Sequence, residues 1–221
     1  MIGNLSAEAV RVLGAMIEKE RSTPEYYPLT LNALKTACNQ KSNRFPVVSY
    51  SESDVIRALD ELEKWRLVGH ASGAGSRSQK FQHAAGHAME LSEAETAVMA
   101  CLFLRGAQTP GEIKGRTGRL YPFESLEEVD TTLSNLQARD EPLVASVARR
   151  PGQKEDRFVH LVGEEDVSNQ SYQDAASDPS TGVTLSGPSD SDADIHEQVL
   201  LLRDELDRLR AEFDAFREQF D

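Results

Sequence analysis

The side chains best suited to chemistry in this sequence are cations and amides that cluster in three polar segments. Lysine and arginine neutralise phosphates, and the amides of asparagine and glutamine bond to base edges or to phosphate oxygens. This combination favours a surface that binds nucleic acid or another polar partner. The candidate binding residues are Asn39, Gln40, Lys41, Asn43 and Arg44 in a central loop, Arg77 and Lys80 in a first hairpin, and Arg149, Arg150, Lys154 and Arg157 in a second hairpin.

The same residues have a second interpretation, in which they do not bind a partner. The charges of the hairpins are also typical of solvated loops. The central loop is followed by Phe45 and Pro46, and a residue before proline favours an extended backbone. A loop with a fixed exit is suited to bracing two parts of the molecule, so a binding loop and a structural brace are both consistent with this pattern.

Residues for catalysis or metal binding do not occur at a usable spacing. The sequence has no Ser-His-Asp order, glycine-rich phosphate loop, HExxH or paired cysteines. His83 and His160 fall at equivalent places in two similar segments, which favours packing over catalysis. Cys38 and Cys101 lie in apolar helical contexts, so we expect buried thiols. We therefore predict a protein that is not an enzyme and that needs no cofactor and no metal.

The candidate residues are positioned by a unit that the chain contains twice. Residues 51–67 have apolar side chains at helical spacing and begin with Ser51 and Asp54 as a capping pair. A glycine-rich turn and an extended segment, residues 80–83, follow. Residues 125–136 repeat the helix, with Ser125 and Glu128 as an expected capping box, and a second turn and extended segment follow. The matching apolar pairs are Val55 with Val129, Leu59 with Leu133, and Leu62 with Leu136.

Two further helices precede this unit in each half of the chain. The first begins at Ser6 in one half and at Ser92 in the other. The second begins at Thr30 in one half and at Thr109 in the other, where Pro110 follows as the first helical residue. The expected buried stripe of the first helix is Val10, Leu13, Met16 and Ile17. Three helices and a two-stranded wing are typical of a winged-helix module.

The predicted fold is therefore mainly α with small β-wings, in two tandem winged-helix modules. Module 1 covers residues 1–84 and module 2 covers residues 85–163. An acidic linker rich in Ser, Asp, Gly and Pro covers residues 164–194, and a coiled-coil helix covers residues 195–221.

The central loop also carries a family resemblance. The strings TPEYYPLTLNALKTACNQKSNRFPV, residues 23–47, and PGQKEDRFVHL, residues 151–161, resemble the YceH family of bacterial proteins. Its members resemble tandem winged-helix proteins and have no established activity. The resemblance spans residues 5–163 and implies a fold rather than a function.

The net charge of −13 is concentrated in the tail, because residues 164–221 contain 16 acidic and 4 basic side chains. We expect the linker to be disordered and the last helix to form a parallel homodimer; the alternative is a helix that folds back on its own modules. The expected dimer seam is Ile195, Val199, Leu202, Leu206, Leu209, Phe213, Phe216 and Phe220. No signal or membrane-spanning pattern occurs, so we expect a cytoplasmic protein without a membrane partner.

The expected function is non-catalytic binding, and two partners compete for it. DNA, contacted through the central loop and the basic wings, is favoured by analogy with other winged-helix proteins. A protein docked on the modules is favoured by carboxylates on the third helices, such as Asp60 and Asp130, which would repel phosphates. We expect Tyr26, Tyr27 and Trp65 to be buried contacts rather than a platform for stacked bases.

Overall fold

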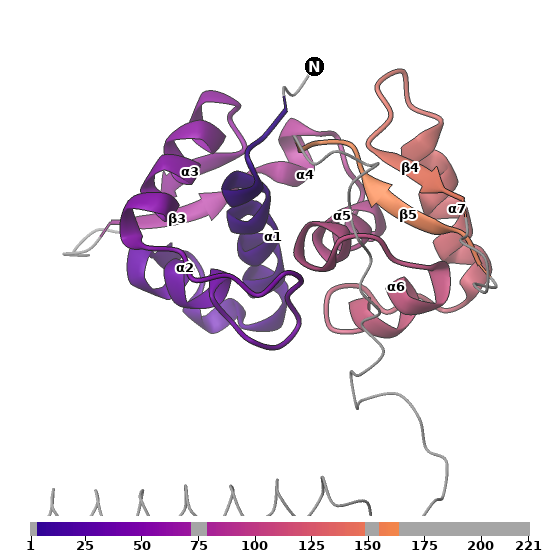
Figure 1. The fold of residues 1–221 in the computed structure, drawn as a ribbon, viewed down its shortest axis with the longest axis horizontal. Coiled ribbons are helices and arrows are strands. Elements are labelled where there is room, and N and C mark those ends of the chain that lie inside the picture. The colour runs from indigo at the N-terminus through magenta and orange to yellow at the C-terminus, as the bar shows by residue number, and fades with distance from the viewer. Residues whose placement is uncertain (1–3, 72–78, 149–154, 164–221) are drawn as a thin grey trace, which may run out of the picture. The chain divides into compact units, whose positions relative to one another are not determined.

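The computed structural model describes residues 4–71, 79–148 and 155–163, all of which lie in one compact unit, Met1–Tyr172 (Figure 1). The described residues are mainly helical and contain two small antiparallel sheets. The first half consists of α1 (Ala7–Ser22), the 3-10 turn η1 (Pro24–Tyr26), β1 (Leu29–Thr30), α2 (Leu31–Cys38), α3 (Glu52–Lys64), β2 (Val68–Ala71) and β3 (Lys80–His83). The second half consists of α4 (Ala85–Ala88), α5 (Glu93–Arg105), α6 (Pro110–Thr117), α7 (Leu126–Gln137), β4 (Val144–Val147) and β5 (Arg157–His160).

The order of three helices and then a hairpin thus occurs twice, as the sequence predicts. We refer to residues 5–83 as the first repeat and to residues 92–160 as the second. The short helix α4 connects them and was not predicted. The expected coiled coil and linker lie outside the described residues.

The helix starts confirm most of the predicted caps. Ser6 and Thr30 each accept a hydrogen bond from a backbone N–H of the first turn, and Ser51, Ser92 and Thr109 form complete capping boxes.

The predicted capping box at the start of α7 is wrong in its second half. Ser125 Oγ accepts from the Glu128 N–H at 3.2 Å, as expected. The Glu128 carboxylate, however, accepts from the Tyr121 hydroxyl and from the Glu124 N–H, both at 2.8 Å. The tyrosine ahead of the helix competes for the carboxylate, which therefore holds the incoming loop instead of closing the box.

In each repeat, a backbone segment just before the second helix pairs with the second strand of the hairpin. In the first repeat the strand order is β1-β3-β2, and Leu29 pairs with Phe81. In the second repeat β4 pairs with β5, and Gln108 exchanges backbone hydrogen bonds with Phe158 at 3.0 and 2.8 Å. Gln108 therefore takes the place that β1 has in the first repeat.

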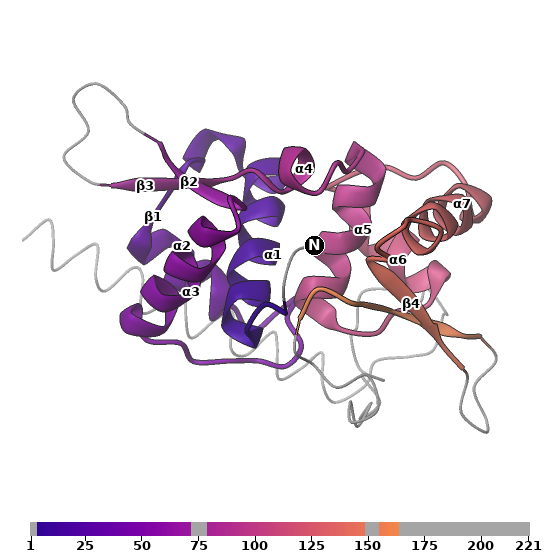
Figure 2. The same ribbon diagram turned by 90° about the horizontal axis from the view of Figure 1, so that it is seen from above.

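The two repeats share one core. Helices α1 and α5 lie side by side at the centre of the described unit (Figures 1 and 2). The expected stripe of α1 is buried, but so are residues outside it, including Val12 and, on the opposite side of the helix, Ala15. α5 is buried from Thr96 to Leu104. Each helix is covered by its own repeat on one side and by the other repeat on the other side.

Gly14 lies where these two helices approach each other closely. A Cβ placed on Gly14 would lie 2.8 Å from Cβ of Phe103 and 3.1 Å from Leu104. Glycine is thus required there by contact with α5, not by a turn.

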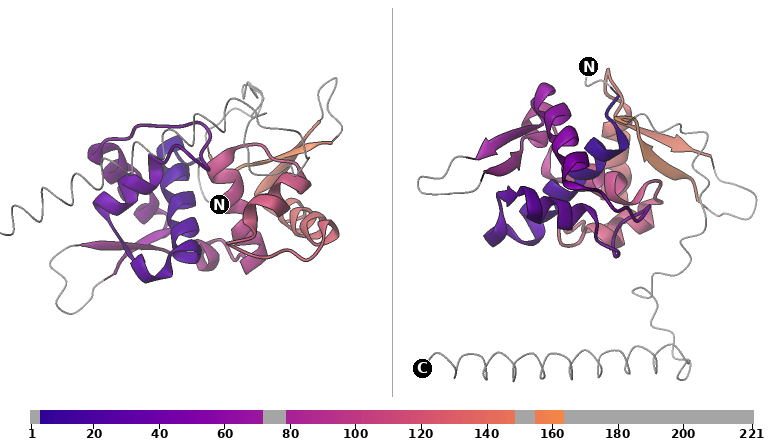
Figure 3. Two further views of the ribbon diagram at one scale, coloured as in Figure 1. Left: turned by 90° about the horizontal axis from the view of Figure 1, so that it is seen from below. Right: turned by 60° about the vertical axis from the view of Figure 1, so that its left-hand side comes forward.

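The two hairpins point away from the shared core in different directions (Figures 2 and 3). β2 and β3 extend from the first repeat, and β4 and β5 extend from the second. The turn residues of both hairpins, 72–78 and 149–154, lie outside the described residues.

Several predicted buried residues can be checked directly. Cys38 and Cys101 are free and buried, and burial raises the pKa of the first thiol to about 12 and of the second to about 11. The expectation for two aromatic residues is wrong, because Tyr26 is 72% exposed and Trp65 is 39% exposed. Tyr26 belongs to the surface turn η1 and Trp65 follows the last residue of α3, so neither lies on a covered face.

The side chains of the two histidines in the hairpin strands have little exposure, as expected of packing residues. His83 Nε2 bonds Glu20 at 3.0 Å, and its Nδ1 accepts from the Ala85 N–H at 3.3 Å. His160 packs edge-on against Phe103, with ring centroids 5.1 Å apart. Burial lowers the pKa of His160 to about 4.

The lowered pKa of His160 predicts a loss of stability in mild acid. The folded protein keeps this ring neutral down to about pH 4, whereas the unfolded chain protonates it below about pH 6.5. The unfolded state therefore binds more protons in this window, and the free energy of unfolding falls as the pH falls. His160→Leu should lose about 2 kcal/mol less than the parent protein between pH 7 and pH 5.

Urea unfolding of both proteins at both pH values measures the difference. His83 is present in each protein, so its contribution cancels. Equal losses in the two proteins would contradict the prediction.

Candidate functional site

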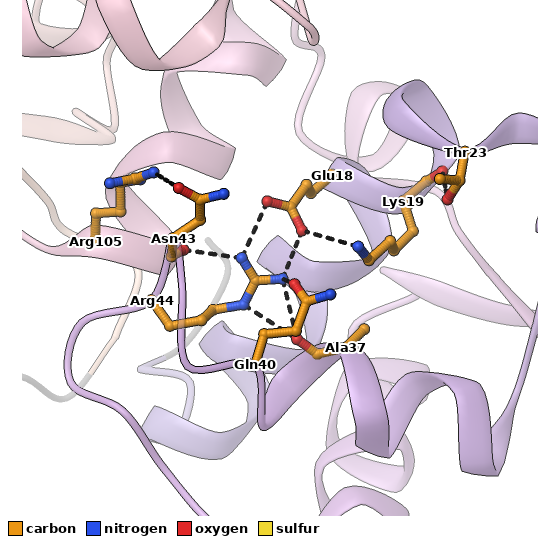
Figure 4. A network of polar contacts seen from close by, with 8 residues as sticks. All are labelled: Glu18, Lys19, Thr23, Ala37, Gln40, Asn43, Arg44 and Arg105. Carbon is orange, nitrogen blue, oxygen red and sulfur yellow. Dashed lines mark hydrogen bonds and ion pairs between the residues drawn. The ribbon is translucent and has the colours of Figure 1, made fainter. Parts of the chain in front are cut away.

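The central loop is organised around Arg44, whose side chain is fully buried (Figure 4). Its guanidinium faces the carboxylate of Glu18 on α1. Nη1 donates to Oε1 at 3.0 Å and Nη2 donates to Oε2 at 2.5 Å. This is the bidentate geometry that makes arginine–carboxylate pairs strong.

The remaining donors of Arg44 bind the loop itself. Nε and Nη2 donate to the carbonyl of Ala37 at 3.1 and 3.0 Å, which holds the last turn of α2. Nη1 donates to the carbonyl of Asn43, and Nη2 donates to Oε1 of Gln40, each at 2.8 Å. The guanidinium is therefore fully used inside the protein and has no free edge for a phosphate.

Asn39 closes the same loop at its other end. Its Nδ2 donates to the carbonyl of Tyr50, and its Oδ1 accepts from the Tyr50 N–H, both at 2.8 Å. The side-chain amide thus bonds both the N–H and the carbonyl of Tyr50, as the backbone of a paired β-strand would. Asn39 holds the two ends of residues 39–50 together.

The loop also contacts the second repeat. The Phe45 N–H donates to the carbonyl of Leu104 at 2.8 Å, and Oδ1 of Asn43 accepts from the Arg105 guanidinium (Figure 4). Leu104 belongs to the last turn of α5, where carbonyls lack helical partners. Arg11 on α1 donates to the carbonyl of Pro46 at 2.7 Å. The loop therefore braces the two repeats, which is the second of the interpretations that the sequence leaves open.

The predicted cation of the second hairpin is also bound internally. Arg157 donates from Nη1 to Oε2 of Glu112 at 2.7 Å and from Nη2 to Oε1 at 3.2 Å. Nη1 donates in addition to the carbonyl of Ala107 at 3.0 Å. This pair fastens β5 to the first turn of α6.

Two predicted binding residues remain exposed or partly exposed without such bonds. The side chains of Lys41 and Lys80 form no hydrogen bond or ion pair with the part of the chain that the structure describes. Arg77, Arg149, Arg150 and Lys154 lie outside the described residues. The structure thus brings Asn39, Gln40, Asn43 and Arg44 together, but as partners of one another and of the two repeats.

A groove of about 500 Å³ lies between the first turn of α2, the outer face of α3 and the first hairpin. Leu31, Ile56, Leu59 and Phe81 line it with apolar groups. Ile56 is 44% exposed although it is a large aliphatic residue. We refer to this feature as the α3 groove.

Polar residues of α3 and the hairpin complete the α3 groove. Asp60 and Glu63 are the acidic lining residues. His70 Nε2 lies 2.9 Å from Oε1 of Glu63, and Gln79 Nε2 lies 2.7 Å from Nδ1 of His70. The His70 ring stands against Phe81, with centroids 5.2 Å apart. These contacts fix the hairpin wall of the groove relative to α3.

Within residues 4–71, 79–148 and 155–163, no three His, Cys, Asp or Glu side chains are grouped so that they could hold a metal ion. In the same ranges, every helix is too short or too polar to cross a lipid bilayer.

A family model described as "Protein of unknown function, DUF480" matches residues 5–153. The chain belongs to the DUF480 family. It is 45% identical over 217 residues to a UPF0502 protein of Vibrio parahaemolyticus, covering 96% of this chain and 97% of the relative. It is 51% identical over 160 residues to a UPF0502 protein of Geobacter sulfurreducens, covering 72% and 73%. The resemblance to YceH proteins is thus confirmed as membership of a family without an assigned function, and none of these names states an enzymatic activity.

This member of the DUF480 family contains bracing residues that the sequence analysis missed. Glu18 and Arg11 lie on α1, and Glu61 on α3 accepts from the Ser6 N–H and hydroxyl at 2.9 and 2.6 Å. Glu18 directly follows Ile17, the last buried residue of α1. A carboxylate at the edge of a buried stripe was the one feature of the sequence that could have indicated a buried ion pair. Its partner, Arg44, lies too far along the chain for helical periodicity to connect them.

Proposed function

We propose that this protein is a non-catalytic binding protein that docks a partner protein on two winged-helix modules. The observation that supports this most is the distribution of charge around α3. Of the four described cations expected to meet phosphates, the two arginines, Arg44 and Arg157, are neutralised by Glu18 and Glu112. Lys41 and Lys80 are not, but the outer face of α3 exposes Asp60. A surface with this pattern repels DNA and suits a protein.

The order of elements supports the winged-helix part of the proposal. Each repeat consists of three helices followed by a hairpin, and each hairpin gains one further pairing near the second helix. Winged-helix proteins commonly place the third helix in the major groove of DNA. Here the third helices, α3 and α7, would bring Asp60 and Asp130 towards the phosphates.

We expect the full-length protein to form a 1:1 complex with a protein partner that reassembles from the two purified components. Duplex DNA in excess should not displace the partner, because the docking face is acidic. Sedimentation of the purified pair measures the stoichiometry. Asp60→Lys should weaken the complex, whereas Asp130→Lys on α7 is the matched control. A complex that duplex DNA dissolves would contradict protein docking.

DNA contact through the hairpin turns is the second candidate. Both hairpins point away from the core, and their turns carry Arg77, Arg149, Arg150 and Lys154 in the sequence (Figure 3). If they bind DNA, log affinity should fall by about 0.9 per log unit of salt for each phosphate neutralised. Arg149→Ala with Arg150→Ala should then weaken binding and flatten that slope. No binding to mixed duplex DNA at low salt would remove this candidate.

We further propose a homodimer formed through residues 195–221, in which the stripe that includes Leu202 and Leu209 is the seam. Leu202→Asp with Leu209→Asp places two carboxylates in consecutive layers of the seam, each costing several kcal/mol when buried without a partner. Sedimentation should show a dimer for the parent chain and a monomer for the double variant. A parent chain that is monomeric at tens of micromolar contradicts the dimer.

A further inference from the structure

The α3 groove contains residues that the fold itself does not require. The second repeat has the same helix, α7, and the buried positions Val55 and Val129 correspond. By the same alignment, exposed Ile56 corresponds to exposed Asp130. Because the second repeat folds with aspartate at this position, an apolar side chain here is not a general requirement of the third helix.

The charged side chains that line the groove are acidic. Asp60 and Glu63 line it, and its described lining residues include no lysine or arginine. At the corresponding positions the second repeat has Ser134 and Gln137, which are uncharged. The apolar floor and the acidic side thus occur together in the first repeat alone.

The spacing of these residues follows from helix geometry. Ile56, Asp60 and Glu63 stand at i, i+4 and i+7, on one side of α3. With a rise of about 1.5 Å per residue, Asp60 lies about 6 Å and Glu63 about 10 Å from Ile56 along the axis. An extended peptide advances about 3.3 Å per residue and alternate side chains share a face. Its second residue after an apolar anchor, about 7 Å along, therefore reaches Asp60, and a long cationic side chain on its fourth residue, about 13 Å along, reaches Glu63.

We propose that the α3 groove binds an extended, basic segment of the partner protein, with one large apolar side chain seated beside Ile56 and two arginines or lysines paired with Asp60 and Glu63. This rests on the proposed protein-docking function and names the chemistry of the segment that is recognised. Charge complementarity selects this occupant. Nucleic acid carries the wrong charge, and so does the chain's own segment 195–221, which contains 8 acidic and 4 basic residues.

A defined peptide tests the proposal with the full-length protein. The probe is a labelled, amidated nonapeptide that contains one leucine, arginines at the second and fourth positions after it, and glycine or serine elsewhere. Fluorescence anisotropy measures its affinity. Replacing the leucine by alanine should weaken binding about tenfold, and replacing both arginines by glutamates should abolish it.

Protein variants locate the binding site. Ile56→Asp should abolish binding of the probe, and Asp60→Asn should weaken it severalfold and reduce its dependence on salt. Glu52 and Asp60 stand four residues before and after position 56, so Ile56→Asp should lower the thermal unfolding midpoint by roughly 2 to 4 °C and leave the protein folded at the assay temperature. Leu126→Asp is the matched control, since Leu126 is 49% exposed on α7, and it should bind the probe as the parent does.

The outcomes separate this inference from the proposed function. Equal binding of the arginine and glutamate peptides, or binding that Ile56→Asp does not change, overturns the inference. If no peptide binds while the purified partner still forms its 1:1 complex with Ile56→Asp, the inference falls and protein docking stands. If the peptide and every protein partner fail while duplex DNA binds, both proposals fall.

Discussion

Replacing Arg44 by methionine is expected to lower the free energy of unfolding by about 3 kcal/mol or more. The change removes both bonds to Glu18 and leaves its carboxylate, 17% exposed, facing an apolar group. It also removes the donors that satisfy the carbonyls of Ala37 and Asn43. Urea unfolding at pH 7 measures the loss.

Two further variants test the physical reason. Lys41→Ala, three residues away and exposed, should change stability by less than about 0.5 kcal/mol. Glu18→Met together with Arg44→Met should be more stable than Arg44→Met alone, because no carboxylate then faces the apolar side chain at position 44. An Arg44→Met protein as stable as Lys41→Ala would show that the loop is not a brace.

Replacing Gly14 by leucine should be at least as damaging, with a loss of about 3 kcal/mol or more, and Gly14→Ala should lose about 2 kcal/mol. A Cβ at Gly14 meets Cβ of Phe103 at 2.8 Å. The Cβ of Phe103 is fixed to the backbone of α5, so no side-chain rotation relieves the contact. The two helices must move apart, which opens the core that both repeats share.

Gly115→Ala in α6 is the matched control. Nothing lies within 4 Å of a Cβ at this helical glycine. The same substitution should therefore stabilise the protein by about 0.5 to 1 kcal/mol, since alanine favours the helix. Urea unfolding measures both variants, and a Gly14→Ala protein that gains stability as Gly115→Ala does would contradict the close contact of α1 with α5.

The sequence predicted the elements well because their signals are local. A capping box within four residues predicts the start of a helix, and the structure confirms three of them. They are Ser51 with Asp54, Ser92 with Glu95, and Thr109 with Glu112. β3 was likewise predicted at residues 80–83. The apolar pairs of α3 and α7 are buried as the repeat indicated.

The sequence could not predict what depends on distant contacts. Periodicity indicates one buried stripe on α1, but it does not indicate that α5 covers the opposite side of the helix. Arg44 and Glu18 lie in different elements, 26 residues apart. The sequence alone therefore does not show whether Arg44 is buried in an ion pair or exposed to solvent. The α3 groove is formed by α2, α3 and the hairpin together. Its one local signal was Ile56, an apolar residue on the polar face of its helix.

The pairing of Leu5 with the far end of the described unit affects how the chain folds during its synthesis. Leu5 is fully buried, and its N–H donates to the carbonyl of Val162 at 2.9 Å. A ribosome adds roughly 5 to 20 residues per second, so residue 162 follows residue 5 by on the order of 10 s. During that interval the Leu5 N–H lacks its partner carbonyl, and until residue 105 has been added the side of α1 that faces α5 is uncovered. We therefore expect the first repeat to complete its packing only after the second repeat has emerged.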